Sequence, residues 1–370
     1  MREYLLVFLV GVAVCFCLTP ACRSLALRTG AVAKVRGRDV HDHATPYFGG
    51  LGMLGGLAGA YLVASRMPFL SRYHIVQTDS LVVLAAAAVI CLVGVIDDLF
   101  EINVLMKIAG QVLAAGILVL FGVRMQWLPW GGGIITLGPA ASIIITVFVV
   151  FVCANAINIV DGLDGLAAGI VAISSSAFFV YAYWLTAEEG LARATTAALI
   201  TVAMCGICLG YLPFNFHPAK IFMGDSGAML LGLLFAASTI SLTGQIDPSV
   251  LNDRSGLVAA YVPLVLPLIA LGLPFLDMFV AYTRRTWQGV WWFVADKQHL
   301  HHRLLQRGHS HRAAVMLMWA WTALLAGSAL SLGLFPSPIT LGVVVAALLA
   351  TLAFVITTGR KTSLERTDQP

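Results

Sequence analysis

Aspartates stand at the ends of apolar segments in this sequence, where they could act on a phosphate. Asp97 and Asp98 are adjacent in the run GVIDDLFE, and Asp225 follows the loop NFHPAKIFMG. Carboxylates at membrane depth are costly unless they are paired or functional. Neighbouring carboxylates can hold a divalent cation or act as a base toward phosphate. The alternative for each residue alone is structural: a helix end that becomes acidic near water, or for Asp225 a helix cap.

A second polar run, NAINIVDGLDGLAAG, enters another apolar segment. Asn155, Asn158, Asp161 and Asp164 recur every three residues, so on a helix they would share one face. A polar turn with a helix cap would explain Asp164 but not the whole set. The pattern therefore predicts a binding site, and the neighbouring glycine at Gly162 keeps its backbone open.

Basic and aromatic residues accompany these carboxylates. Lys107 lies about one turn into the next apolar segment, where it could offset the acidic pair or meet a phosphate. The loop ADKQHLHHRLLQRGHSHR is rich in histidine, lysine and arginine, which favours an anion site suited to a diphosphate. A zinc site is the alternative, and it would need carboxylate or thiolate ligands at tetrahedral spacing. Phe222, three residues before Asp225, could stack on a base.

The composition places these residues in a membrane protein. Of 370 residues, 59% are hydrophobic and 11% charged, whereas soluble domains have roughly 25% charged residues. With about 20 apolar residues needed for each crossing, we expect an all-α polytopic protein of about eleven transmembrane helices, forming one catalytic domain over 1–357 before a disordered cytoplasmic tail at 358–370. WLPWGGGIITLGPA, between two spans, predicts a short external hairpin. The expected spans are 4–27, 48–66, 79–99, 104–123, 140–159, 166–186, 193–212, 226–245, 257–282, 313–333 and 337–357.

The distribution of positive charge predicts the orientation. Most of the 22 lysines and arginines fall on one side of these spans, and by the positive-inside rule that side is cytoplasmic. The N-terminus is then outside, the C-terminus is cytoplasmic, and the polar loops at 28–47, 100–103, 160–165, 213–225 and 283–312 all face the cytoplasm. We therefore expect an active site on the cytoplasmic face. The small net charge of +4 gives no indication of nucleic-acid binding.

Five motifs, in order along nearly the whole chain, give a family resemblance. They are RDVH with TPYFGG, GVIDDLFE, NAINIVDGLDGLAAG, AKIFMGDSG and DKQHLHHRLL. Together they resemble the polyprenyl-phosphate N-acetylhexosamine-1-phosphate transferases, the bacterial family that starts lipid-linked cell-envelope glycans. The HLHH form is similar to the branch that uses UDP-N-acetylglucosamine, whereas the phospho-MurNAc-pentapeptide branch usually has three consecutive histidines. The resemblance implies a multi-pass protein of the bacterial inner membrane.

The resemblance also implies roles for individual residues. Asp97 and Asp98 match the family's catalytic pair, and Asp225 matches its Mg²⁺ ligand, with Asn158 nearby. Asp39 stands where the family commonly has lysine, a departure in the first loop. The remaining expected contacts are, for the nucleotide, Asn155, Asp161, Gly162, Leu163, Asp164 and Phe222; for the diphosphate and sugar, His299, His301, His302 and Arg303; and for the lipid phosphate, Lys107, Arg38 and His41.

The implied reaction moves a sugar phosphate from a UDP-N-acetylhexosamine to a polyprenyl phosphate and releases UMP. It implies Mg²⁺, for which Mn²⁺ could substitute, and membrane lipid as a partner; a homodimer is left open. Two alternatives remain. One is the same reaction with another donor, such as UDP-MurNAc-pentapeptide. The other is an ion-coupled secondary transporter, which would place carboxylates near mid-span and show related halves.

Overall fold

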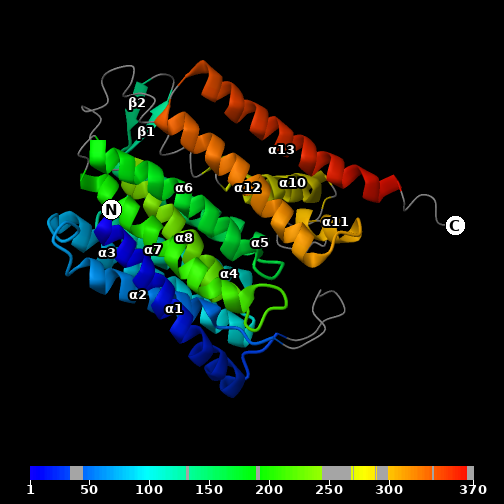
Figure 1. Ribbon diagram of the computed structural model, residues 1–370, viewed down its shortest axis with the longest axis horizontal. Helices are drawn as coiled ribbons and strands as arrows, with labels where there is room; N and C mark the ends of the chain where they lie inside the picture. The colour runs from blue at the N-terminus through cyan, green and yellow to red at the C-terminus, as the bar shows by residue number, and fades with distance from the viewer. Residues whose placement is uncertain are drawn as a thin grey trace.

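In the described part of the chain, the structure is nearly all-helical. The computed structural model describes residues 1–33, 45–130, 133–188, 192–243, 268–269, 271–287, 289, 299–335 and 337–364. The helices are α1 (Arg2–Thr29), α2 (Gly49–Ala64), α3 (His74–Phe100), α4 (Val104–Leu120), α5 (Pro139–Val160), α6 (Leu166–Glu188), α7 (Ala192–Asn215), α8 (Gly224–Thr243), α10 (Gly272–Trp287), α11 (Leu300–Gln306), α12 (His311–Leu334) and α13 (Pro338–Leu364) (Figure 1).

The helix lengths and compositions confirm a polytopic membrane protein. Seven described helices are long and apolar enough to cross a membrane, and three shorter apolar helices accompany them. Each of these ten overlaps an expected span. The remaining expected span, 257–282, lies mostly outside the described residues, and α10 begins within it at Gly272. At the C-terminus, α13 runs on to Leu364, into the segment expected as a tail.

The predicted hairpin is present between α4 and α5. Strands β1 (Trp127–Trp130) and β2 (Gly133–Thr136) pair antiparallel, with Trp127 opposite Thr136. The hairpin is tied to α5 by Thr146, whose hydroxyl accepts a hydrogen bond of 3.0 Å from the Met125 backbone N–H. This polar contact lies at the opposite end of α5 from Asn158.

Helix α8 is the centre of the bundle. Its whole apolar span is buried inside the protein, compared with 22% for α1. It packs against α2, α3, α5 and α7, while α12 packs against α6 and α13 (Figure 1). A helix surrounded by other helices has its axial position and rotation fixed by them. The residues at its N-terminus, including Asp225, are therefore fixed too.

Two glycines let the start of α8 approach its neighbours closely. A side chain added at Gly94 of α3 would overlap the backbone of Ser226, and one added at Gly50 of α2 would overlap the backbone of Gly227. Small residues at such contacts let membrane helices pack backbone to backbone. The first turn of α8 is thus clamped between α2 and α3.

This close packing predicts a stability difference between two Gly→Ala variants. Gly94→Ala should destabilise the protein by about 1–3 kcal/mol, the usual cost of overpacking, because the backbone of Ser226 cannot yield as a flexible side chain would. Gly116→Ala on α4 is the matched control, since a side chain there meets nothing within 4 Å. Thermal melting of the purified proteins in detergent measures both. Equal melting temperatures for the two variants would contradict the clamp.

Candidate active site

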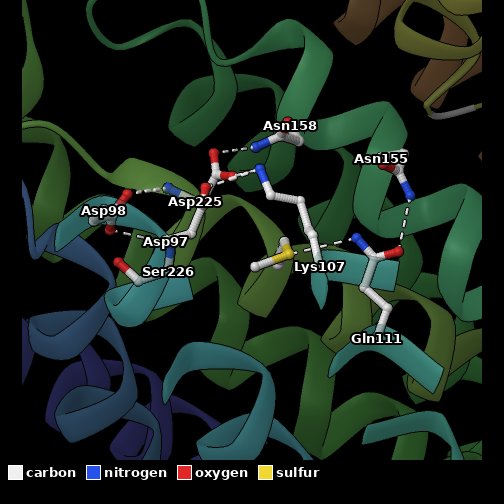
Figure 2. A network of polar contacts seen from close by, with 9 residues as sticks. Asp97, Asp98, Lys107, Gln111, Asn155, Asn158, Asp225 and Ser226 are labelled. Atoms are coloured by element: carbon white, nitrogen blue, oxygen red, sulfur yellow. Dashed lines mark hydrogen bonds and ion pairs between the residues drawn. The ribbon is translucent and has the colours of Figure 1, made fainter. Parts of the chain in front are cut away.

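The polar residues predicted from separate motifs meet where α3 and α5 end and where α4 and α8 begin. Asp97 and Asp98 come from the last turn of α3, Lys107 from the first turn of α4, Asn158 from the end of α5 and Asp225 from the start of α8 (Figure 2). The turn between α3 and α4 is short, and both of the helix ends that it joins are capped. Glu101 ends α3 in a left-handed conformation (φ 50°), and the Asn103 side chain accepts from the Met106 N–H that begins α4.

Asp225 is the centre of this cluster. Its Oδ1 accepts a hydrogen bond of 2.7 Å from Asn158 Nδ2, and its Oδ2 forms an ion pair with Lys107. The Lys107 ammonium also lies 2.9 Å from Asp97 Oδ2, so it sits between two carboxylates. The side chains of Asp97, Asp225 and Lys107 are 14%, 21% and 24% exposed, respectively. The cluster is therefore reachable from one end of the bundle.

Asp98 makes a different contact from its neighbour. Its carboxylate accepts hydrogen bonds from the backbone N–H groups of Asp225 (2.9 Å) and Ser226 (3.4 Å). Gly224, in the left-handed region at φ 70°, leaves the space that the carboxylate fills. A negative charge at a helix N-terminus satisfies unpaired donors and favours the helix dipole. Asp98 thus caps α8 and fixes the backbone of Asp225.

The segment before α8 is held by backbone pairing with the start of α2. The Phe222 N–H donates to Pro46 O (2.8 Å), and the N–H groups of Gly49 and Gly50 donate to Phe222 O and Met223 O (3.0 and 3.1 Å). The ring of Phe222 lies 6.1 Å from that of Tyr47. This pairing fixes where Phe222 stands relative to Asp225.

The loop between α5 and α6, from Asp161 to Gly165, is tied to the α7–α8 loop. Asn215 accepts from the Gly165 N–H (2.9 Å) and donates to Ile221 O (3.1 Å). Asp161 is half-buried in this loop, and Leu163 is buried. Burial raises the pKa of Asp161 to about 8, and the negative charges of Asp225 and Asp98 add to the effect. Positive charge brought to this end of the bundle would favour its ionised form.

Asp164 is engaged by two histidines from other segments. Its carboxylate lies 2.7 Å from His217 Nδ1 and accepts from the Ala219 N–H (3.1 Å), while its own backbone N–H donates to His311 Nε2 (3.0 Å). The three side chains are close enough to share a metal ion. However, His311 Nε2 already accepts a hydrogen bond, and the two imidazoles stack at 4.1 Å instead of converging. This cluster holds the loop, and the Asp164 side chain is only 1% exposed.

Helix α11 carries the histidine motif and begins on a carboxylate that the sequence reading did not identify. Asp277 of α10, 3% exposed, accepts from the Leu300 N–H (2.9 Å) and lies 3.1 Å from His299 Nδ1. The available signal was an aspartate inside an apolar helix, FLDMFVAY, which is costly without a partner. Asp277 therefore orients His299 and the start of α11.

His301 packs directly on the loop that contains Asp161. It is 2% exposed, and a side chain added at Gly162 would overlap its Nε2 atom. Burial, with the nearby His302 and His299, holds the pKa of His301 well below its usual range, which favours the neutral imidazole. Its Nδ1 is buried without a hydrogen-bond partner within the described chain. An incoming acceptor or donor could satisfy that nitrogen.

The other predicted residues are placed as follows. His302 lies beside His301, with ring centroids 4.3 Å apart, and Arg303 follows in α11. Asn155 lies one turn deeper than Asn158 and donates to Gln111, a residue that the sequence reading did not identify. Arg38 and His41 lie outside the described residues.

Comparison with known proteins gives consistent matches over most of the chain. Residues 80–243 match glycosyl transferase family 4. The chain is similar to the decaprenyl-phosphate N-acetylglucosaminephosphotransferase of Mycobacterium tuberculosis (strain ATCC 25618 / H37Rv), with 42% identity over 360 residues, 95% of this chain and 89% of that protein. It is 31% identical, over 86% of this chain and 82% of the relative, to the probable undecaprenyl-phosphate N-acetylglucosaminyl 1-phosphate transferase of Bacillus subtilis (strain 168). It is 29% identical, over 88% and 96%, to the phospho-N-acetylmuramoyl-pentapeptide-transferase of Mycobacterium leprae (strain TN).

The cap at Asp98 predicts different stabilities for two substitutions. Asp98→Ala removes the acceptor for the first N–H groups of α8 and should cost about 0.5–2 kcal/mol. Asp98→Asn keeps a side-chain oxygen at the same place and should retain most of that stability. Thermal melting of both variants in detergent makes the comparison. The capping role would be contradicted if Asp98→Asn had the same melting temperature as Asp98→Ala. It would also be contradicted if Asp98→Ala had the melting temperature of wild type.

Proposed function

Because this chain belongs to glycosyl transferase family 4, as a polyprenyl-phosphate N-acetylhexosamine-1-phosphate transferase, we propose that it transfers N-acetylglucosamine 1-phosphate from UDP-N-acetylglucosamine to a polyprenyl phosphate. One observation carries the proposal: Asp97, Lys107, Asn158 and Asp225 converge from four helices at one partly exposed end of the bundle. Such a cluster suits a charged phosphate that arrives from water and a lipid phosphate held at the membrane surface.

The membrane arrangement is part of the proposal. The protein would have eleven spans in a bacterial plasma membrane, with the N-terminus outside and both the C-terminus and the site cytoplasmic. The positive charge of the loops supports this orientation, since a basic loop and the carboxylate cluster then share one side. A cytoplasmic site would also face the supply of nucleotide sugar.

A Mg²⁺ ion fits the residues of the cluster. Asp97 and Asp225 both reach the Lys107 ammonium, so two carboxylates already converge on one cationic position. Mg²⁺ binds through one or two carboxylates and completes its shell with phosphate oxygens and water. Asp225 would hold the ion, with Asn158 and Asp97 beside it, and Mn²⁺ could serve in the same place. When bound, the ion would neutralise the diphosphate and stabilise the leaving UMP.

The chain's own residues would share the remaining tasks. Lys107, which pairs with both Asp97 and Asp225, would also bind an oxygen of the incoming phosphate. Asp97 would orient the acceptor phosphate and keep it deprotonated. Asp98 would act through α8, by holding the backbone of Asp225. His301 would meet the diphosphate of the donor, and Phe222 would pack against uracil.

The reaction requires only exchange at one phosphorus. An oxygen of the polyprenyl phosphate attacks the sugar-bearing phosphorus of the donor and forms a new P–O bond. The bond from that phosphorus to the bridging oxygen breaks, and UMP leaves with the electron pair. Positioning and charge stabilisation account for most catalysis in such transfers.

The choice of donor rests on similarity. The M. tuberculosis relative, named for N-acetylglucosamine phosphate, is 42% identical, whereas the M. leprae relative named for phospho-N-acetylmuramoyl-pentapeptide is 29% identical. The HLHH form of the motif favours the same choice. A transporter is disfavoured because the site carboxylates lie at helix ends and not near mid-span.

The direct test is UMP release by purified protein in detergent. The assay contains polyprenyl phosphate, Mg²⁺ and, in turn, UDP-N-acetylglucosamine, UDP-N-acetylgalactosamine and UDP-MurNAc-pentapeptide. We expect release that depends on the acceptor and is fastest with UDP-N-acetylglucosamine. Preference for the pentapeptide donor would revise the substrate, and no release with any donor would refute the function.

Activity should depend on a divalent cation through Asp225. Excess EDTA should abolish turnover, and added Mg²⁺ should restore it. Asp225→Asn should also be inactive while its melting temperature stays close to that of wild type, because the side chain lies at a helix end and outside the packed core. Full turnover in EDTA would exclude a metal requirement. If Asp225→Asn failed to fold, Asp225 would have a structural role instead.

His301→Ala should lower the catalytic efficiency of the enzyme toward the donor. A hydrogen bond to a charged phosphate is worth roughly 1.5–3 kcal/mol, so we expect at least about a tenfold loss in kcat/KM for the donor. The KM for the acceptor should change much less. Steady-state kinetics with each substrate varied in turn gives both values. Donor kinetics within twofold of wild type would exclude His301 from the site.

A further inference from the structure

We propose that Gln111 and Asn155 form a partly buried bridge that positions Lys107 and Asn158 around Asp225. The inference rests on the proposed function, in which those three residues form the phosphate and metal site. It assigns a role to Gln111, and it gives Asn155 a positioning role in place of nucleotide contact.

The bridge lies one helical turn deeper than the site and comes from two of the same helices. On α4, Gln111 follows Lys107 by four residues, and on α5, Asn155 precedes Asn158 by three, so each pair shares a helix face. Asn155 Nδ2 donates to Gln111 Oε1 at 3.0 Å (Figure 2). The same two helices that present the Lys107 ammonium and the Asn158 amide to Asp225 are therefore joined directly beneath them.

The bridge also reaches the helix that carries Asp225. Gln111 Nε2 donates to Met229 Sδ at 3.4 Å, and Met229 lies four residues after Asp225 on α8. Three helices thus contribute one residue to the upper cluster and one to the lower bridge. Rotation of α4 about its axis would break both layers together.

Burial explains why the bridge can set geometry. Gln111 is only 2% exposed, and an amide in the membrane interior must find a partner or bear a large cost. A leucine at position 111 would fill similar space, but its apolar contacts are not directional. Helix α4 could then rotate about its axis without losing a hydrogen bond. On the side toward α3, Gly110 already lies against Val93 with no room for a side chain. The amide pair supplies the directional contact on the side toward α5.

The donors of Asn155 are already used. Its Nδ2 donates both to Gln111 Oε1 and to Phe151 O (2.7 Å), which accounts for both of its N–H groups. A nucleotide contact through that nitrogen would require one of these bonds to break. The geometry therefore favours an inward role for Asn155, whereas Asn158, one turn nearer the open end, faces Asp225.

A double-mutant cycle tests the bridge. Gln111→Leu and Asn155→Leu should each lower kcat by about tenfold while both KM values stay within about twofold, because binding contacts remain and alignment is lost. The double variant should be no slower than the slower single variant, since either change breaks the same contact. If Asn155 instead binds nucleotide, Asn155→Leu will raise the donor KM and its effect will add to that of Gln111→Leu.

A swap and a control separate positioning from general damage. Gln111→Asn combined with Asn155→Gln keeps an amide pair of the same total length, and it should recover at least about a third of the lost kcat. Thr146→Val removes a buried polar contact at the far end of α5 and should leave kinetics within twofold of wild type. No recovery in the swap, or equal loss in Thr146→Val, would overturn the proposal.

Failure of the bridge and failure of the proposed function give different results. If wild type is active and the single variants match it, the bridge is refuted and the function stands. If wild type releases no UMP with any donor, the function is refuted. The four proteins of the double-mutant cycle (wild type, Gln111→Leu, Asn155→Leu and the double variant) are then compared by thermal melting. Non-additive losses of melting temperature would then support the Gln111–Asn155 contact, and additive losses would overturn it.

Discussion

The contact between the Asp98 carboxylate and the first N–H groups of α8 is the interaction on which the site depends. Helix α8 is buried along its whole span, so its N-terminal donors need partners from the protein. Asp98 supplies them, and the close approach of α3 at Gly94 brings Asp98 near enough to do so. That cap fixes Asp225, and Lys107 and Asn158 are then arranged around a carboxylate whose position is already set.

The same end of the bundle shows a division between groups that hold structure and groups that remain accessible. Asp164, Asn215 and Asp277 are buried and bind loops or helix starts to one another. Asp97, Lys107 and Asp225 remain 14–24% exposed. Rigid support beneath a partly open set of charges favours electrostatic catalysis, because the helix ends that present the charges are already in place before substrate binds. The Asp98 cap and the Gln111–Asn155 bridge belong to the support.

Much of this arrangement follows from the sequence, and the reasons for the exceptions are physical. The lengths of the apolar segments predict the helices, and the polar residues at the segment ends predict which loops lie together. The sequence alone therefore predicts that Asp97, Asp225 and Asn158 are close in space. Lateral contacts between helices have no signature in the spacing of residues along either helix. Gln111 was therefore missed, and neither the cap made by Asp98 nor the inward contact of Asn155 was foreseen. Asp277 could have been recognised, because a carboxylate inside an apolar helix requires a partner.

We propose that Asp225 organises a divalent cation site at this end of the bundle, and the other site residues depend on it. Electron paramagnetic resonance of Mn²⁺ measures it without catalysis, by titrating the ion into wild type and into Asp225→Asn in detergent with UDP present. We expect one Mn²⁺ bound per wild-type chain and binding at least about tenfold weaker in Asp225→Asn, since removing a charged ligand costs on the order of 1.4 kcal/mol or more. Equal Mn²⁺ affinity in the two proteins would contradict it.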